Sequence, residues 1–92
     1  MNKVELINLI ADNTGVTKKV TNVVVSEVFD EIMEQVAAGE SVQTLGFGTF
    51  EPRTRNARKA KNPSTGEEIL VPSRKVPAFK AGKKFKNLVE AK

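Results

Sequence analysis

The first forty residues carry apolar side chains at helical spacing. One stripe, at positions 6, 7, 10 and 11, predicts a first helix that begins at the N-cap residue Asn2 and ends near Gly15. A second stripe recurs at every fourth position from 20 to 36, and it predicts a second helix from Thr17 to about Ala38, with Gly39 as its stop signal. This stripe is broad enough to face a partner as well as the first helix.

The pattern changes to that of strands and turns in the second half of the chain. Residues 41–45 alternate and predict a short strand, 46–48 predict a reversal, and the next strand starts at Thr49. Residues 81–91 are expected to form a last helix. Three of its side chains are expected to face inward: Phe85, Leu88 and Val89. These elements together predict an α+β fold.

Residues 53–75, called the ribbon below, are expected to form two extended strands joined at a tight tip. Basic residues at 53, 55, 59 and 61 share one parity, so they line one face of an extended chain. A reversal is predicted around Pro63, which presets φ, and Gly66, which tolerates a positive φ. Almost no large apolar side chain lies between Arg53 and Thr65. We therefore expect the ribbon to pack on another molecule.

Size and composition narrow the possible functions. A chain of 92 residues predicts one domain that buries only about 60–65% of the surface of its unfolded form, so we expect an oligomer. The absence of Cys and His excludes disulfides, a zinc site with the usual ligands and a Ser-His-Asp triad. No apolar run approaches the 18 residues of a membrane span, and we expect a cytoplasmic protein with no membrane contact.

Charge is divided unevenly along the chain. Residues 1–50 hold three lysines and seven carboxylates, for a net charge of −4, whereas residues 51–92 hold twelve Lys and Arg against four Glu, for +8. This asymmetry indicates a body of acidic or neutral character that carries a polyanion-binding surface.

Other functions fit the sequence less well. A helix-turn-helix would place the second helix in the DNA major groove, but that helix carries four carboxylates that repel phosphates. The segment Leu45–Phe50 has some likeness to the aromatic strand of an RNA-recognition motif but lacks its basic and aromatic residues, so RNA is only a secondary partner. No residues are expected to be catalytic, and no cofactor or metal is expected.

The dipeptide Asn62-Pro63 has two interpretations. Pro63 can serve turn geometry alone, or it can act as a rigid apolar wedge at an exposed tip. Minor-groove proteins use such wedges to unstack a base step and kink the duplex by roughly 20–90°.

Several motifs together resemble a known family. The motif Gly46-Phe47-Gly48-Thr49-Phe50, followed by Arg55, Arg58, Asn62-Pro63 and Thr65-Gly66, is similar to the signature of the bacterial histone-like HU and integration host factor family. The resemblance covers essentially the whole chain. The opening Met1-Asn2-Lys3 and the segment 75–83 look more like HU than integration host factor.

The resemblance implies an intertwined dimer with a helical base, an antiparallel β-sheet saddle and two β-ribbon arms. It divides the single domain into a dimerisation base (1–39), a saddle and arm (40–81) and a C-terminal helix (82–92). The implied function is to bend and compact double-stranded DNA with little sequence preference, as a nucleoid-associated homodimer. Since bent, nicked or gapped duplexes cost less to deform, we expect them to bind more tightly. The open alternatives are a sequence-specific subunit like integration host factor and an RNA-binding domain.

The resemblance also implies a set of DNA-binding residues. Pro63 matches an intercalating proline, and Asn62 precedes it. The cations that match positions meeting DNA in the arm and saddle are Arg53, Arg55, Arg58, Lys59, Lys61, Arg74 and Lys75. Those that match flanking phosphate contacts are Lys80, Lys83 and Lys86, with Lys3 as a weaker candidate. Family members often have Gly-Arg where this chain has Ala60-Lys61, and lysine lacks the planar fork of arginine.

Overall fold

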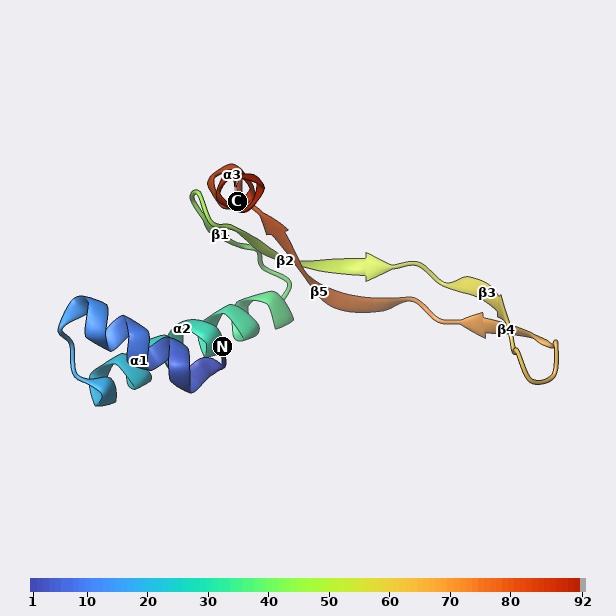
Figure 1. Cartoon of the computed structure of the whole chain (residues 1–92). Helices are drawn as coiled ribbons and strands as arrows, with labels where there is room; N and C mark the ends of the chain where they lie inside the picture. The colour runs from blue at the N-terminus through green and yellow to red at the C-terminus, as the bar shows by residue number, and fades with distance from the viewer. Residues whose placement is uncertain (92) are drawn as a thin grey trace. The chain divides into compact units, whose positions relative to one another are not determined.

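The computed structural model describes residues 1–91. Over that range the chain forms three helices and five strands in the order α1, α2, β1 to β5, α3 (Figure 1). The predicted α+β class is therefore confirmed. Internal contacts divide the chain into two compact units, Met1–Glu34 and the part from Gln35 onwards, and each is described by itself.

Helix α1 (Lys3–Thr14) forms where its capping residues predict it. The Asn2 side chain accepts a hydrogen bond from the Glu5 N–H at 2.9 Å, which satisfies one free donor of the first turn. At the other end, Gly15 adopts a left-handed φ of 75° and its N–H bonds the Ala11 carbonyl. Ile7 and Ala11, from the predicted stripe, are the buried apolar side chains of the described residues.

Helix α2 (Lys18–Ala37) leaves most of its apolar stripe uncovered. Thr17 caps it by accepting a hydrogen bond from the Val20 N–H at 3.3 Å, and Gly39 beyond its end has a φ of 94°. Six apolar side chains are between 41% and 64% exposed: Val20, Val23, Val24, Val28, Phe29 and Met33. Since α2 buries only Thr21, a single chain does not complete a core around this helix.

The second unit is built on a three-stranded antiparallel sheet of order β1-β2-β5. Its strands are β1 (Val42–Thr44), β2 (Gly48–Arg55) and β5 (Arg74–Ala81). Phe50 pairs with Val42 on one side and with Phe79 on the other. The rings of Phe47, Phe50, Phe79 and Phe85 form a cluster with centroid distances of 4.8–6.2 Å.

Helix α3 (Lys83–Glu90) is attached to the reversal between β1 and β2. The Gly82 N–H donates to the Phe47 carbonyl at 2.7 Å, and the Phe85 N–H donates to the Gly46 carbonyl. Phe85 joins the aromatic cluster as predicted. The prediction that Leu88 and Val89 also face inward is wrong for the single chain, where they are 58% and 62% exposed. The ring of Phe85 and the backbone bonds of Gly82 and Phe85 attach the start of α3, whereas no apolar layer within residues 1–91 covers Leu88 and Val89.

Candidate nucleic-acid interface

The ribbon is one antiparallel ladder with a two-residue interruption. In its first part β2 pairs with β5 as far as Arg55↔Arg74, and in its second part β3 (Arg58–Lys61) pairs with β4 (Glu68–Val71) (Figure 1). Residues 56–57 on one side and 72–73 on the other belong to neither ladder. Because the gaps are equal, the register is the same on both sides of the interruption. The predicted two-stranded ribbon is confirmed.

Backbone and side-chain hydrogen bonds close the tip of the ribbon. The Asn62 N–H donates to the Glu67 carbonyl, and the Gly66 N–H donates to the Asn62 carbonyl, both at 2.8 Å. The Asn62 Oδ1 accepts from the Ser64 N–H at 2.9 Å, a local bond typical of Asx turns. Gly66 has a φ of 74°, as the turn prediction requires. Pro63 is therefore held at an exposed, internally bonded tip.

The ribbon exposes every cation that the sequence placed on it. These side chains are Arg53, Arg55, Arg58, Lys59, Lys61, Arg74 and Lys75. Arg53 differs from the others because its Nη2 and Nε lie 3.1 and 3.2 Å from the Glu51 Oε1. Within residues 1–91, no carboxylate forms an ion pair with the remaining six. The ribbon thus presents a strong positive charge that its own chain leaves largely uncompensated.

All four prolines of the chain lie in or beside the ribbon. Pro52 and Pro77 oppose each other in the β2–β5 ladder, beyond the point where β1 stops pairing with β2. Proline cannot donate a backbone hydrogen bond, so it is tolerated where a strand has no neighbour on that side. Prolines and cations along an edge also oppose pairing with strands of other proteins. The ribbon is therefore suited to a ligand other than another strand.

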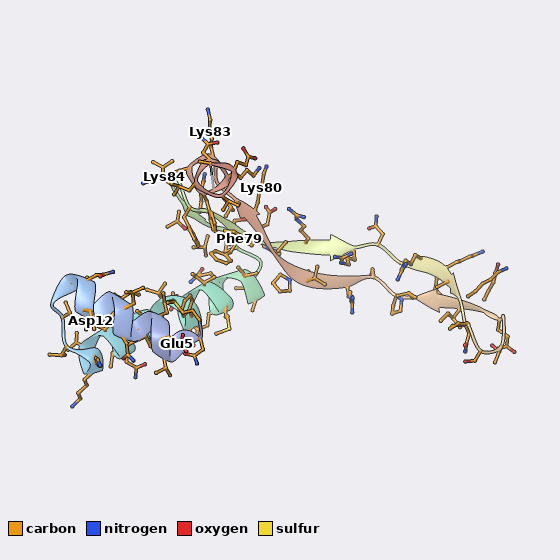
Figure 2. The ribbon with its side chains drawn as sticks, viewed as in Figure 1. Glu5, Asp12, Phe79, Lys80, Lys83 and Lys84 are labelled. Atoms are coloured by element: carbon orange, nitrogen blue, oxygen red, sulfur yellow. The ribbon has the colours of Figure 1, made fainter. Side chains whose placement is uncertain are left out.

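A second group of cations surrounds the start of α3. Lys80 is an exposed residue next to the end of β5, and Figure 2 shows it near Lys83 and Lys84 of α3. A hollow of about 620 Å³ between the β1–β2 reversal and α3, called the lysine hollow below, is lined by Lys80, Lys83, Lys84 and Lys86 among others. The structure brings together three predicted flank residues and adds Lys84. The adjacent pair Lys83-Lys84 could have suggested it from the sequence.

Lys3 is the one predicted site residue outside the second unit. It is the first residue of α1 and is exposed. Two further features are absent from residues 1–91. No cluster of acidic side chains there could hold a metal ion, and no helix there is long and apolar enough to cross a membrane.

The chain is similar to known bacterial DNA-binding proteins. A family model described as bacterial DNA-binding protein matches residues 1–90. DNA-binding protein HU of Geobacillus stearothermophilus is 52% identical over 90 residues, covering 98% of this chain and 100% of the relative, and HU-1 of Halalkalibacterium halodurans is 54% identical over the same span. The chain therefore belongs to the bacterial DNA-binding protein family, in its HU branch, and the resemblance noted in the sequence is confirmed.

Solved structures agree with this assignment. An Anabaena HU–DNA cocrystal structure superposes with a TM-score of 0.90 at 44% identity, covering 97% of both chains. HU from Thermotoga maritima superposes with a TM-score of 0.69 at 32% identity, covering 97% of this chain and 98% of that one.

Proposed function

We propose that this chain is an architectural protein that binds and bends double-stranded DNA with little sequence preference, and that it has no catalytic role. The observation that carries the proposal is the exposed ribbon, with six cations that lack a carboxylate partner in residues 1–91 and with Pro63 at its closed tip. The Anabaena relative was solved as a cocrystal with DNA, which supports DNA as the ligand.

Affinity comes chiefly from phosphate neutralisation. Each Lys or Arg that meets a phosphate releases condensed counterions, and this gain is independent of sequence. The proposed contacts on each ribbon are Arg55, Arg58, Lys59, Lys61, Arg74 and Lys75, together with Asn62 near the tip. Arg53 also faces the DNA, but its pairing with Glu51 limits its contact with phosphate. A two-stranded ribbon of this kind fits a DNA groove, and cations that enter the minor groove distinguish its width better than its base sequence.

Bending follows from the tip and from the lysines of the body. Pro63 is a compact apolar group that can enter a base step, where unstacking costs a few kcal/mol. The bend brings flanking DNA onto the lysine hollow, and we propose that Lys80, Lys83 and Lys86 meet phosphates there, with Lys3 as a further flank contact. These contacts offset the deformation, since they form only when the duplex is bent. A duplex already nicked or gapped deforms more easily and should bind more tightly.

The partner of the helical part is a second copy of this chain. The exposed stripe of α2 is a contiguous set of large apolar side chains, which in a soluble protein marks an interface. A symmetric pair presents two ribbons and therefore makes two kinks. We propose that residues 1–39 form the dimerisation base, 40–81 the saddle and arm, and 82–92 the C-terminal helix. We propose that the dimer is associated with the nucleoid, in the cytoplasm, because it is bound to the DNA that it compacts.

The bending role is tested by Pro63→Ala, with Pro77→Ala as a control that makes the same change at the root of the ribbon. Energy transfer between dyes at the two ends of a duplex reports the bend, and titration reports affinity. We expect Pro63→Ala to lose bend angle with little loss of affinity, and Pro77→Ala to leave the bend unchanged. An unaltered bend in Pro63→Ala would remove the wedge role.

Duplex choice tests the remaining parts of the proposal. Binding is measured over a salt series to intact, nicked and cruciform duplexes of one sequence. Equal affinity for nicked and intact duplexes would count against bending as the mechanism. A sharp consensus from binding-site selection would indicate a sequence-specific protein, and stronger competition by structured RNA than by duplex DNA would indicate an RNA-binding one.

A further inference from the structure

The interruption in the ribbon forms a hollow lined by arginines. This arginine hollow has a volume of about 370 Å³ and is lined by Arg55, Asn56, Arg58, Val71, Pro72 and Arg74. It lies where residues 56–57 and 72–73 leave the ladder. Pro72 has no N–H to donate, which favours a gap in strand pairing at this point. Arg55 and Arg58 lie on either side of the gap in one strand, and both residues line the hollow.

The charges around this hollow are unfavourable in the protein alone. Arg55 and Arg74 are directly opposite each other in the ladder, and like charges in that arrangement destabilise a sheet. Arg58 adds a third positive charge on the other side of the gap. None of the three has a carboxylate partner within residues 1–91, in contrast to Arg53 with Glu51. An anion placed among them would relieve the repulsion.

The geometry points to a shared phosphate site: the three arginines of the hollow together hold one phosphodiester of the DNA backbone. This inference rests on the proposed function and adds to it how the ribbon divides its charge. Guanidinium groups present planar forks that match phosphate oxygens with paired hydrogen bonds, which the neighbouring lysines cannot do. The hollow thereby fixes the position of the ribbon on the duplex, whereas Lys59 and Lys61 each contact a phosphate of their own.

The dependence of affinity on salt counts the phosphates involved. The logarithm of the association constant falls against the logarithm of salt concentration with a slope of about −0.9 per neutralised phosphate. If the three arginines share one phosphate, replacing all three by alanine reduces the steepness by about 0.9 per ribbon. If they contact separate phosphates, the reduction is about 2.7 per ribbon. Both values double for a dimer with two ribbons.

The experiment compares Arg55→Ala, Arg58→Ala, Arg74→Ala and the triple variant on one duplex, with Lys59→Ala, Lys61→Ala and their double variant as matched controls. Thermal melting checks that each variant is folded. We expect the arginine variants to be non-additive, each single change altering the slope by much less than 0.9 per ribbon. We expect the two lysine changes to add, to about 1.8 per ribbon.

A second set of variants separates geometry from charge. Replacing all three arginines by lysine keeps the charge but removes the forks, so we expect weaker binding with an unchanged slope. Additive effects near 2.7 per ribbon for the alanine triple variant would overturn the shared site while leaving DNA binding intact. An unchanged affinity and slope in that variant would overturn both the shared site and the role of these arginines in the proposed function. Full affinity in the lysine triple variant would also overturn the shared site.

Discussion

The ion pair between Glu51 and Arg53 predicts that this carboxylate restrains DNA binding. Both residues lie on β2, two positions apart, so their side chains share one face of the strand. The Glu51 Oε1 accepts from the Arg53 Nη2 at 3.1 Å and from Nε at 3.2 Å, and the side chains are 32% and 56% exposed. An arginine that is paired with a carboxylate presents little net charge to a phosphate. Glu51→Gln keeps the size of the side chain and releases Arg53.

The expected effects are small on stability and larger on the salt dependence. An exposed ion pair contributes about 0.2–1 kcal/mol to folding, so the variant should melt close to the parent. If freed Arg53 neutralises one further phosphate, the slope steepens by about 0.9 per ribbon. Between 50 and 200 mM salt, the affinity of the variant should then fall by an additional factor of about 3.5 per ribbon. At low salt the variant should bind more tightly than the parent.

Fluorescence anisotropy with a labelled duplex measures this over the salt range for four proteins: the parent, Glu51→Gln, Arg53→Ala and the double variant. We expect Arg53→Ala alone to change the slope little and to abolish the gain made by Glu51→Gln. The double variant also reports the general effect of removing one negative charge. If Arg53→Ala alone flattens the slope by about 0.9 per ribbon and Glu51→Gln leaves it unchanged, then Arg53 already binds phosphate and Glu51 does not restrain DNA binding.

Three further predictions concern the fold that supports the interface. Gly48→Ala places a Cβ 2.5 Å from the Lys80 carbonyl oxygen and 2.6 Å from the Phe79 ring, so it should destabilise the protein by about 1–3 kcal/mol in thermal melting, and an unchanged melting temperature would contradict that packing. Val28→Asp puts a charge on the exposed stripe of α2 and should yield a monomer in sedimentation, whereas a stable dimer would place the interface elsewhere. Asn62→Ala removes the acceptor for the Ser64 N–H, so amide exchange at the tip should speed up roughly fivefold for a bond worth about 1 kcal/mol, with the body of the protein unaffected.

The features that the sequence predicted correctly depend on neighbouring residues. Asn2 caps α1 through a contact three residues away, and Gly66 takes its left-handed φ in the tip whatever lies elsewhere in the chain. The alternation that defined the ribbon also depends on local chemistry, because a charged segment with few large apolar side chains has no core to join. For these reasons the helices, the ribbon and its exposed cations could all be predicted.

The features that were missed depend on register and on tertiary packing. The sequence does not show that Arg55 and Arg74 lie opposite each other, because this depends on the strand register. The same holds for the gap in strand pairing that follows them. The pairing of Arg53 with Glu51 depends on side-chain conformation rather than on spacing alone. The exposure of Leu88 was missed because a helical stripe shows which side chains share a face but not whether a layer of the same chain covers that face.

The separation of charge along the chain explains how one small protein can present two binding surfaces that attract different ligands. These surfaces are the apolar stripe of α2 and the cationic ribbon. Residues 1–50 are net negative and expose an apolar stripe, so a polyanion is repelled from them while a second copy can bury the stripe. The ribbon is net positive and exposes few large apolar side chains, so it attracts phosphate but offers little to a hydrophobic partner. We therefore expect the carboxylates of α2 to disfavour contact between the duplex and the exposed apolar stripe of that helix.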